Sequence, residues 1–361
     1  MNEPSPQHVF AEVLPQVGAV LHLDTALPQS DPQFGNEYWA LDGSCAVVAP
    51  DRVLTIRHTI KDLGDLTRTG IFLPYEGIFK VVDVQFQSGR DRDRDFDSEK
   101  YDNLALLTLD RKVRHAPGFG VRKIPDGTKD SGFAFIGGYG CWDAEPFGDR
   151  DGLQRRVWVR LGMPDWDQGS HIHYDNLDLA WWSPWNDGRR ALLNNSGGPM
   201  LWISREARGF DVVGINRETK GSQQIGSWIG WDRFEWLHEV GVLPSVDRSV
   251  APKAVGSKVL QVGQKVEEAR RFEIVVPEDA TRILLTLNAT AGLRLQMGVE
   301  ADPGDGFLDR LAGSNLHSGR FLFREHTWED RPPRLVIGVS HVARAFPEAE
   351  AVTAQLCWMF V

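Results

Sequence analysis

The sequence is poor in cysteine, with only Cys45, Cys141 and Cys357 among its 361 residues. An odd number of cysteines, spread over both halves of the chain, does not suit the framework of paired thiols that stabilises small secreted proteins. We therefore expect free, buried thiols in a reducing compartment, and we predict a cytoplasmic location.

The sequence also lacks a block of basic residues and a long apolar run. Its formal net charge is −10, which argues against attraction to nucleic acid or to anionic lipid. No apolar stretch is long enough to span a bilayer. Residues 1–20 carry prolines and acidic side chains instead of a basic start followed by an apolar core, so they do not resemble a secretory signal. We predict neither a nucleic-acid partner nor a membrane partner.

Patterns typical of metal sites are missing too. His171 and His173 have no cysteine or carboxylate at the spacing of a zinc site. We predict no metal and no cofactor.

The chain does have the composition of a globular protein, with 42% hydrophobic and 25% charged residues. Its length favours one large domain followed by a smaller one. Many short apolar runs alternate with turn-forming residues, which indicates an all-β barrel or sandwich. In the first part of the chain these runs cover 16–23, 45–48, 52–56, 70–73, 79–86, 104–109, 132–136, 155–161, 177–182, 200–203 and 210–215.

The second part of the chain begins after one predicted helix. Residues 232–240 have apolar side chains at helical spacing, and residues 246–256 are a predicted linker. We expect domains at 1–245 and 257–361, the second a compact β-sandwich. Its expected strands cover 271–276, 282–287, 293–298, 320–323, 334–339 and 352–359.

One stretch points to chemistry: Ser196 lies in the glycine-rich turn Asn195-Ser196-Gly197-Gly198-Pro199. A serine is a useful nucleophile only if a histidine takes its proton and a carboxylate orients that histidine. His58 follows the run Leu54-Thr55-Ile56-Arg57, and Asp102 precedes the run Leu104-Ala105-Leu106-Leu107. The order histidine, aspartate, serine distinguishes the chymotrypsin arrangement from those of subtilisin and the α/β-hydrolases.

On these three motifs, residues 10–242 resemble the trypsin-like, chymotrypsin-fold serine proteases. The resemblance implies two β-barrels with the triad His58, Asp102 and Ser196 in the cleft between them. It also implies an oxyanion hole formed by the backbone N–H groups of Asn194 and Ser196, although the family usually has glycine at the position of Asn194.

The resemblance is to the bacterial, non-zymogen members of the family. Asn195 stands where zymogen-type members have an aspartate that captures a new N-terminal amine, so activation by trimming is not expected. Thr59 follows His58, so the disulfide that secreted members carry beside this histidine cannot form.

The resemblance places the substrate pocket at Arg190, Asn216 and Gly226. Arg190 would lie at the pocket floor and favour an acidic residue before the cut. The alternative is that Arg189 and Arg190 both point to solvent. Asn216 begins a segment that departs from the family pattern, so its assignment to the pocket wall follows less directly from the resemblance.

Residues 263–288 show a weaker resemblance, to the pre-peptidase C-terminal domains of bacterial peptidases, based on the pattern Phe272-x-Ile274-x-Val276-Pro277. This domain is a candidate site for a regulatory protein partner. We therefore predict a serine endopeptidase that hydrolyses protein or peptide substrates through an acyl-enzyme. The alternative is a catalytically inactive trypsin-like protein that acts as a binding module, and Asn194 is the feature that favours it.

Overall fold

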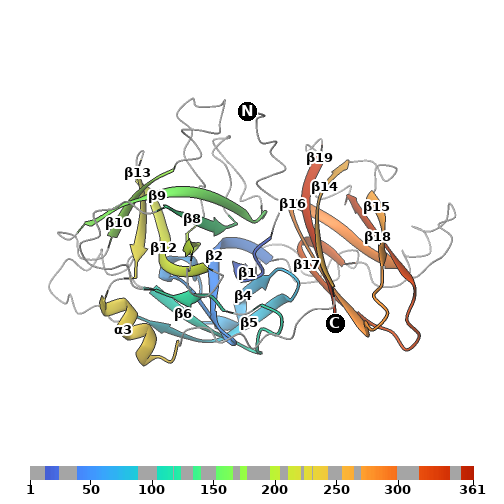
Figure 1. Cartoon of the computed structure of the whole chain (residues 1–361), viewed down its shortest axis with the longest axis horizontal. Coiled ribbons are helices and arrows are strands. Elements are labelled where there is room, and N and C mark those ends of the chain that lie inside the picture. The colour runs from blue at the N-terminus through green and yellow to red at the C-terminus, as the bar shows by residue number, and fades with distance from the viewer. Residues whose placement is uncertain are drawn as a thin grey trace.

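The fold is known from a computed structural model of the whole chain (Figure 1). The structure describes residues 13–23, 39–87, 104–116, 118–122, 133–139, 152–165, 171–176, 196–203, 210–220, 223–229, 231–242, 254–263, 270–298, 317–341 and 351–361. Within these ranges the chain is mostly β-strand with one α-helix, α3 (Trp231–Glu239). The predicted all-β class and the predicted helix are confirmed. No helix in these ranges has the length and apolar character needed to cross a membrane.

The first sheet is a closed six-stranded barrel with strand order β1-β2-β3-β6-β5-β4, closed by the pairing of β1 with β4. Successive residues of its strands enter two different cores. On β3, Val53 packs with residues of the barrel strands and their connections, whereas Leu54 packs in a core shared with the other sheets and α3. Burial on both faces explains why these strands appear in the sequence as continuous apolar runs. The strands are β1 (Val17–Leu23), β2 (Trp39–Ala49), β3 (Arg52–Ile56), β4 (Thr69–Leu73), β5 (Gly77–Phe86) and β6 (Leu104–Leu109).

The second sheet has seven strands in the order β11-β8-β9-β10-β13-β12-β7, and β11 also pairs with β12. Leu201 of β11 and Val212 and Ile215 of β12 are buried in a core that also contains residues of the first barrel, so the two sheets share an apolar core. The strands are β7 (Gly120–Val121), β8 (Phe133–Gly138), β9 (Arg155–Asp165), β10 (His171–Asn176), β11 (Pro199–Ile203), β12 (Phe210–Lys220) and β13 (Gln223–Trp228).

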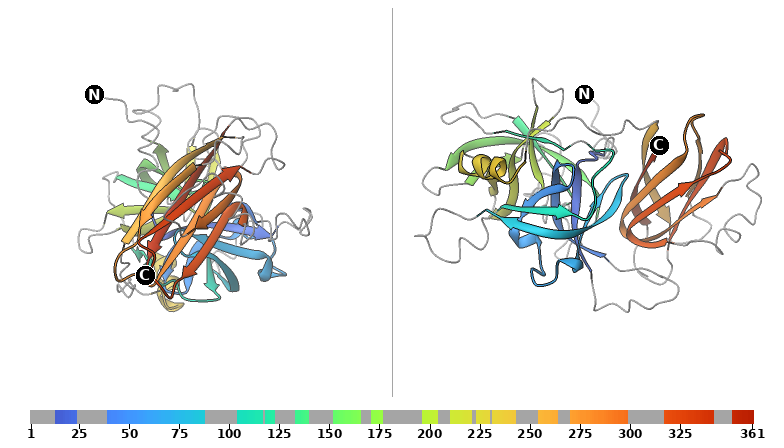
Figure 2. Two further views of the ribbon diagram at one scale, coloured as in Figure 1. Left: turned by 90° about the vertical axis from the view of Figure 1, so that its right-hand side faces the viewer. Right: turned by 90° about the horizontal axis from the view of Figure 1, so that it is seen from below.

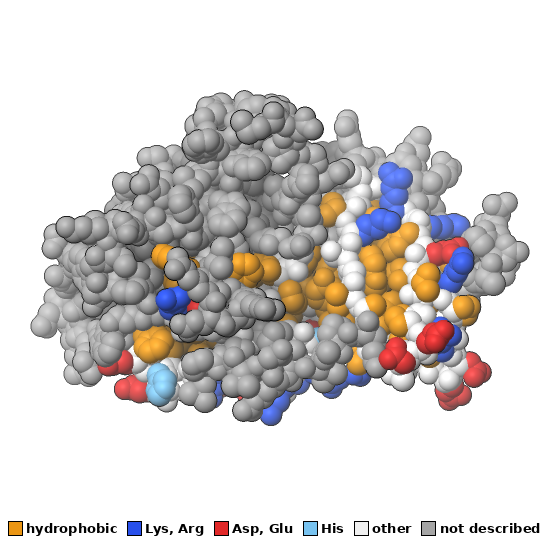
Figure 3. Space-filling view, in the orientation of Figure 1, with side chains coloured by type: hydrophobic (Ala, Val, Ile, Leu, Met, Phe, Trp, Pro, Cys, Tyr) orange, Lys and Arg blue, Asp and Glu red, His pale blue; other side chains and the backbone are white. Residues whose placement is uncertain are grey.

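The third sheet lies beside the first barrel, on the side away from α3 (Figures 1 and 2). Figure 3 shows apolar side chains on this face over the third sheet, with acidic and basic side chains at its outer end. Its order is β14-β19-β16-β18-β15, with β17 paired to β16. The strands are β14 (Ala254–Gly263), β15 (Arg270–Val275), β16 (Arg282–Gly298), β17 (His317–Thr327), β18 (Arg334–His341) and β19 (Ala351–Phe360).

The strand β16 differs from its prediction. Two strands were expected at 282–287 and 293–298, but the chain forms one strand of 17 residues. Its register shifts between Asn288 and Leu293, and it pairs with β19 before the shift and with β18 after it. A bulge of this kind bends a strand without ending it. The other expected strands are present, but several are longer than expected: β2 begins at Trp39 instead of 45, and β17 covers His317–Thr327 instead of 320–323. The expected strand 177–182 lies outside the described residues.

Both faces are buried in β16 up to Ala289 and in β19 from Ala354 to Cys357, the stretches whose burial the structure describes most fully. Leu356 and Phe360 of β19 belong to the core of the third sheet, whereas Cys357 and Met359 pack with Val13 and Tyr75. Tyr75 has a positive φ of 70°, which is costly for a residue with a side chain. Its N–H donates to the Thr286 hydroxyl over 2.9 Å. The third sheet therefore holds the turn between β4 and β5.

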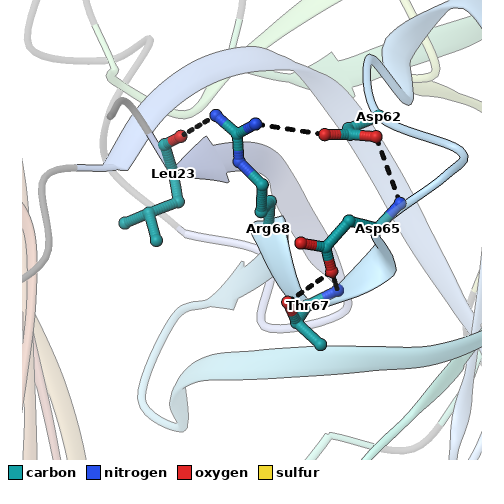
Figure 4. Close-up of polar contacts among 5 residues, drawn as sticks. All are labelled: Leu23, Asp62, Asp65, Thr67 and Arg68. Atoms are coloured by element: carbon teal, nitrogen blue, oxygen red, sulfur yellow. Dashed lines mark hydrogen bonds and ion pairs between the residues drawn. The ribbon is translucent and has the colours of Figure 1, made fainter. Parts of the chain in front are cut away.

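A polar network holds the loop that follows His58 (Figure 4). The loop contains the short 3-10 helix η3 (Leu66–Arg68), whose first turn is capped by the Asp65 carboxylate through Thr67 N–H at 3.1 Å. The Arg68 guanidinium donates to the Leu23 carbonyl at 3.2 Å and to the Asp62 carboxylate at 3.1 Å. The loop is thereby tied to the end of β1.

Candidate functional site

The predicted site residues divide into two groups. His58, Ser196, Asn216 and Gly226 are among the described residues. Asp102, Asn194 and Arg190 lie outside them, as do Arg189 and Asn195.

His58 lies in the 3-10 turn η2 (Arg57–Thr59), directly after β3. The Thr59 hydroxyl donates to the Ile56 carbonyl at 2.7 Å and lies 3.1 Å from the Thr55 hydroxyl. These buried threonine contacts fix the turn. His58 is half-buried and its Nδ1 is shielded from solvent, so this nitrogen faces the protein.

Ser196 opens the turn that leads into β11. Gly197 has a φ of 85°, in the left-handed region that favours glycine. Its N–H donates to the Asn216 carbonyl at 2.8 Å, and Asn216 N–H donates to the Gly198 carbonyl at 2.7 Å. A Cβ on Gly197 would collide with the Ser44 carbonyl oxygen and the Thr55 hydroxyl. The serine turn therefore requires glycine after the serine.

The turns that carry His58 and Ser196 meet at Gly43 and Ser44 of β2. A Cβ on Gly43 would lie 2.6 Å from both the Ser196 carbonyl oxygen and Thr59 Cγ2. Ser44 N–H donates to the Ser196 carbonyl at 2.8 Å, and the Ser44 carbonyl accepts from the Thr55 hydroxyl at 2.7 Å. Two motifs far apart in the sequence are thus held against the same two residues.

The Ser196 hydroxyl donates to the Arg217 carbonyl of β12 at 2.9 Å. A peptide carbonyl can accept this hydrogen bond but cannot serve as a base at neutral pH. The serine must therefore turn toward another group before it can act as a nucleophile.

Asn216 and Gly226 are cross-strand partners in the pairing of β12 with β13. Asn216 is only 4% exposed, and its backbone N–H and carbonyl both form hydrogen bonds with the glycine turn after Ser196. Their contact with substrate stays a prediction.

The described cysteines are free and buried, as predicted: Cys45, next to Ser44, and Cys357 on β19. Burial raises the pKa of both thiols, that of Cys357 to about 12. A thiol that stays protonated is a poor nucleophile, so Cys45 is not a candidate nucleophile. Cys141 lies outside the described residues. Within the described part of the chain, no group of histidine, cysteine and carboxylate side chains is arranged to hold a metal ion.

No motif of the sequence assigned a role in the site to Ser44, Thr55 or Arg217, which contact the two turns. Ser44 and Thr55 are fully buried polar residues in apolar strands, and this interruption of an apolar run is the signal that could have marked them. The Arg217 contact uses a backbone carbonyl, which no side-chain pattern can mark.

Comparisons with known proteins assign no family to this chain. The chain matches no protein-family model, and a search of curated proteins finds no significant match.

Proposed function

We propose that this chain is a serine endopeptidase of the trypsin-like type, which hydrolyses protein or peptide substrates through an acyl-enzyme. The observation that carries the proposal is the meeting of the His58 and Ser196 turns at Gly43 and Ser44. A nucleophile and its base must lie within reach of one another. The turns that carry Ser196 and His58 both pack against Gly43 and Ser44, which supports this requirement.

In the proposed reaction, Ser196 Oγ leaves the Arg217 carbonyl and passes its proton to His58 as it attacks the scissile carbonyl. The backbone N–H groups of Asn194 and Ser196 stabilise the resulting oxyanion. His58 then gives the proton to the leaving amine, which leaves an acyl group bound to Ser196. A water molecule that gives its proton to His58 attacks this acyl group, and the acid product leaves as His58 returns the proton to Ser196.

Asp102 is the proposed partner of His58. The antiparallel pairing of β3 with β6 ends at Ile56 and Leu104. His58 follows Ile56 by two residues, and Asp102 precedes Leu104 by two residues. The shielded Nδ1 of His58 suits this pairing, because a triad carboxylate accepts its hydrogen bond from that nitrogen.

The finer architecture is part of the proposal. The pairing of β11 with β12 joins two strands that are also connected through β8, β9, β10 and β13, which supports a second barrel. We propose that the third sheet is the C-terminal β-sandwich domain. Its first strand begins at Ala254, three residues before the predicted domain start and within the predicted 246–256 linker.

The proposed pocket consists of Arg190, Asn216 and Gly226, and the proposed preference is for an acidic residue before the cut. A guanidinium in a partly desolvated pocket can form two charge-assisted hydrogen bonds with a carboxylate. The pairing of Asn216 with Gly226 supports the wall of this pocket. A regulatory partner at the C-terminal domain and a cytoplasmic location stay predictions.

A second candidate is an inactive trypsin-like protein that binds a partner. The hydrogen bond from Ser196 to the Arg217 carbonyl favours it, because this contact occupies the hydroxyl. Asparagine at position 194, where the oxyanion hole usually has glycine, favours it as well.

Labelling with a fluorophosphonate probe distinguishes the two candidates. The endopeptidase predicts that wild-type protein is labelled at Ser196 and cleaves peptides, whereas Ser196→Ala is not labelled and loses about 10⁶-fold in peptidase rate. Thr281→Ala is the control, because it removes an exposed hydroxyl directly before β16 and should label like wild type. Folded wild-type protein that is neither labelled nor cleaves any peptide pool would exclude the endopeptidase.

A further inference from the structure

A buried amide on the third sheet pairs with the backbone of Gln154. Gln355 of β19 accepts a hydrogen bond from Gln154 N–H at 2.8 Å, and its own NH₂ group donates to the Gln154 carbonyl at 2.8 Å. Asn288 of β16 donates to the Gln355 side-chain oxygen at 2.7 Å and to the Gly152 carbonyl at 2.9 Å. Gln355 and Asn288 are each 1% exposed, so little water is available to replace these bonds.

The side chain of Gln154 also pairs with backbone groups, in this case those before and at the start of β1. Its oxygen accepts from Leu14 N–H at 2.7 Å, and its NH₂ group donates to the carbonyls of Leu14 and Val17, each at 2.9 Å. The same NH₂ group lies 3.4 Å from the Tyr139 hydroxyl. Gln154 therefore fixes the start of β1 and contacts Tyr139.

Tyr139 connects this amide pair to the serine turn. It is fully buried, and its ring packs against Phe321 of β17 with the centroids 6.2 Å apart. Its N–H donates to the Ser44 hydroxyl at 2.8 Å. Ser44 N–H in turn donates to the Ser196 carbonyl at 2.8 Å.

We propose that Gln355 is a positioning residue for the turn that carries Ser196, acting through Gln154, Tyr139 and Ser44. The third sheet is then part of the structure that holds the nucleophile in place. Each member of the series is buried, so loss of one partner leaves a donor or acceptor without a hydrogen bond instead of exposing it to water. The position of Ser44 depends on these bonds, and the Ser196 turn depends on Ser44. The catalytic consequence rests on the proposed function, but the positioning does not.

The test compares Gln355→Met with Met359→Leu. Methionine has nearly the length of glutamine and makes no comparable hydrogen bond. Met359 lies on the same strand, is 2% exposed and packs in the same interface without joining the amide series. The first readout is amide hydrogen exchange at Ser44 and Gly197, the donors that hold the serine turn. The second readout is the rate of fluorophosphonate labelling at several probe concentrations, which gives the binding constant of the probe and the limiting labelling rate separately.

The proposal predicts that Gln355→Met raises exchange at both amides by about tenfold and lowers the limiting labelling rate while the binding constant stays the same. Met359→Leu should leave both readouts close to wild type. The proposal is overturned if Gln355→Met leaves exchange unchanged, or if Met359→Leu raises it equally. If exchange rises as predicted but the wild-type serine is never labelled, the positioning is supported and the endopeptidase proposal is overturned.

Gln355→Glu keeps the test decisive if Gln355→Met fails to fold. A neutral carboxyl can accept from Gln154 N–H and donate to the Gln154 carbonyl, whereas a carboxylate can only accept. At acidic pH the variant should therefore match wild type in exchange at Ser44, and it should exceed wild type once the carboxyl ionises. Equal exchange of variant and wild type across the whole titration would contradict the proposal.

Discussion

Removal of the Phe321 side chain tests whether the first barrel and the third sheet form one structure. Phe321 is 6% exposed and lies in the core shared by the sheets. Its ring centroid is 5.1 Å from that of Phe72 on β4 and 6.2 Å from that of Tyr139, and its edge lies close to Gly152. Phe321→Ala would leave a cavity bounded by groups that the backbone holds in place.

The expected loss in the free energy of unfolding follows from this burial. Truncation of a buried phenylalanine to alanine lowers the free energy of unfolding by about 3–5 kcal/mol, and loss of two aromatic contacts favours the middle of that range. We expect about 4 kcal/mol for Phe321→Ala, a large part of the roughly 5–15 kcal/mol that stabilises a folded domain. Phe272→Ala is the control, because Phe272 is partly exposed and packs on Trp358 within the third sheet.

Urea denaturation followed by tryptophan fluorescence measures both variants, since the chain has 13 tryptophans. We expect one unfolding transition for wild type and a larger loss for Phe321→Ala than for Phe272→Ala. Equal losses, or two separate transitions in the wild type, would refute the reasoning, because they would mean that β17 does not pack firmly against the barrel.

Other predictions concern the site and the buried thiols. Gly197→Ala should lower the free energy of unfolding by at least about 3 kcal/mol. Gly241 also has a positive φ, but a Cβ there would have nothing within 4 Å, so Gly241→Ala should cost only about 1 kcal/mol. Equal losses of the two variants in urea denaturation would contradict the clash predicted at Gly197. Burial raises the pKa of Cys357 from 9.0 to about 12, so above about pH 9 this thiol loses its proton in the unfolded chain and keeps it in the folded chain. Cys357 alone should therefore lower the free energy of unfolding by about 1.4 kcal/mol per pH unit, in addition to the contribution of Cys45. Cys357→Ala should flatten this dependence in urea titrations between about pH 8 and pH 11, and an unchanged slope would count against it. Asp102→Asn should keep the fold yet lose about 10⁴-fold in peptidase rate; survival of the rate within about tenfold would show that Asp102 is not the partner of His58. Arg190→Ala should abolish a preference for acidic residues before the cut in a peptide library, and an unchanged preference would exclude Arg190 from the pocket floor.

Local patterns predicted much of the fold. The runs 52–56 and 104–109 became β3 and β6 with the same ends, because apolar, β-rich sequence and flanking turn residues act within a few positions. Four strands lacked such a pattern, among them the two-residue strand Gly120–Val121. Gln223–Trp228 has polar residues and glycine, His171–Asn176 is polar, and part of Ala254–Gly263 was expected to be linker. Pairing with neighbouring strands stabilises them in place of an apolar pattern of their own.

The same limit applies to the candidate site. The motifs pointed to His58 and Ser196, because each lies at the end of a recognisable run. They could not show that both turns rest on Gly43 and Ser44, because this contact exists only after the barrel closes. Nor could they pair Gln154 with Gln355, which are 201 residues apart. A single polar residue in an apolar strand indicates a buried contact but does not identify its partner.

The most direct test of the central claim is a crystal structure of the protein after reaction with a fluorophosphonate. The account predicts a covalent bond from Ser196 Oγ to phosphorus, with the hydrogen bond to the Arg217 carbonyl broken and Nε2 of His58 within about 3 Å of the adduct. A structure in which phosphorus is absent from Ser196, or in which the His58 ring lies beyond hydrogen-bond reach of it, would contradict the account.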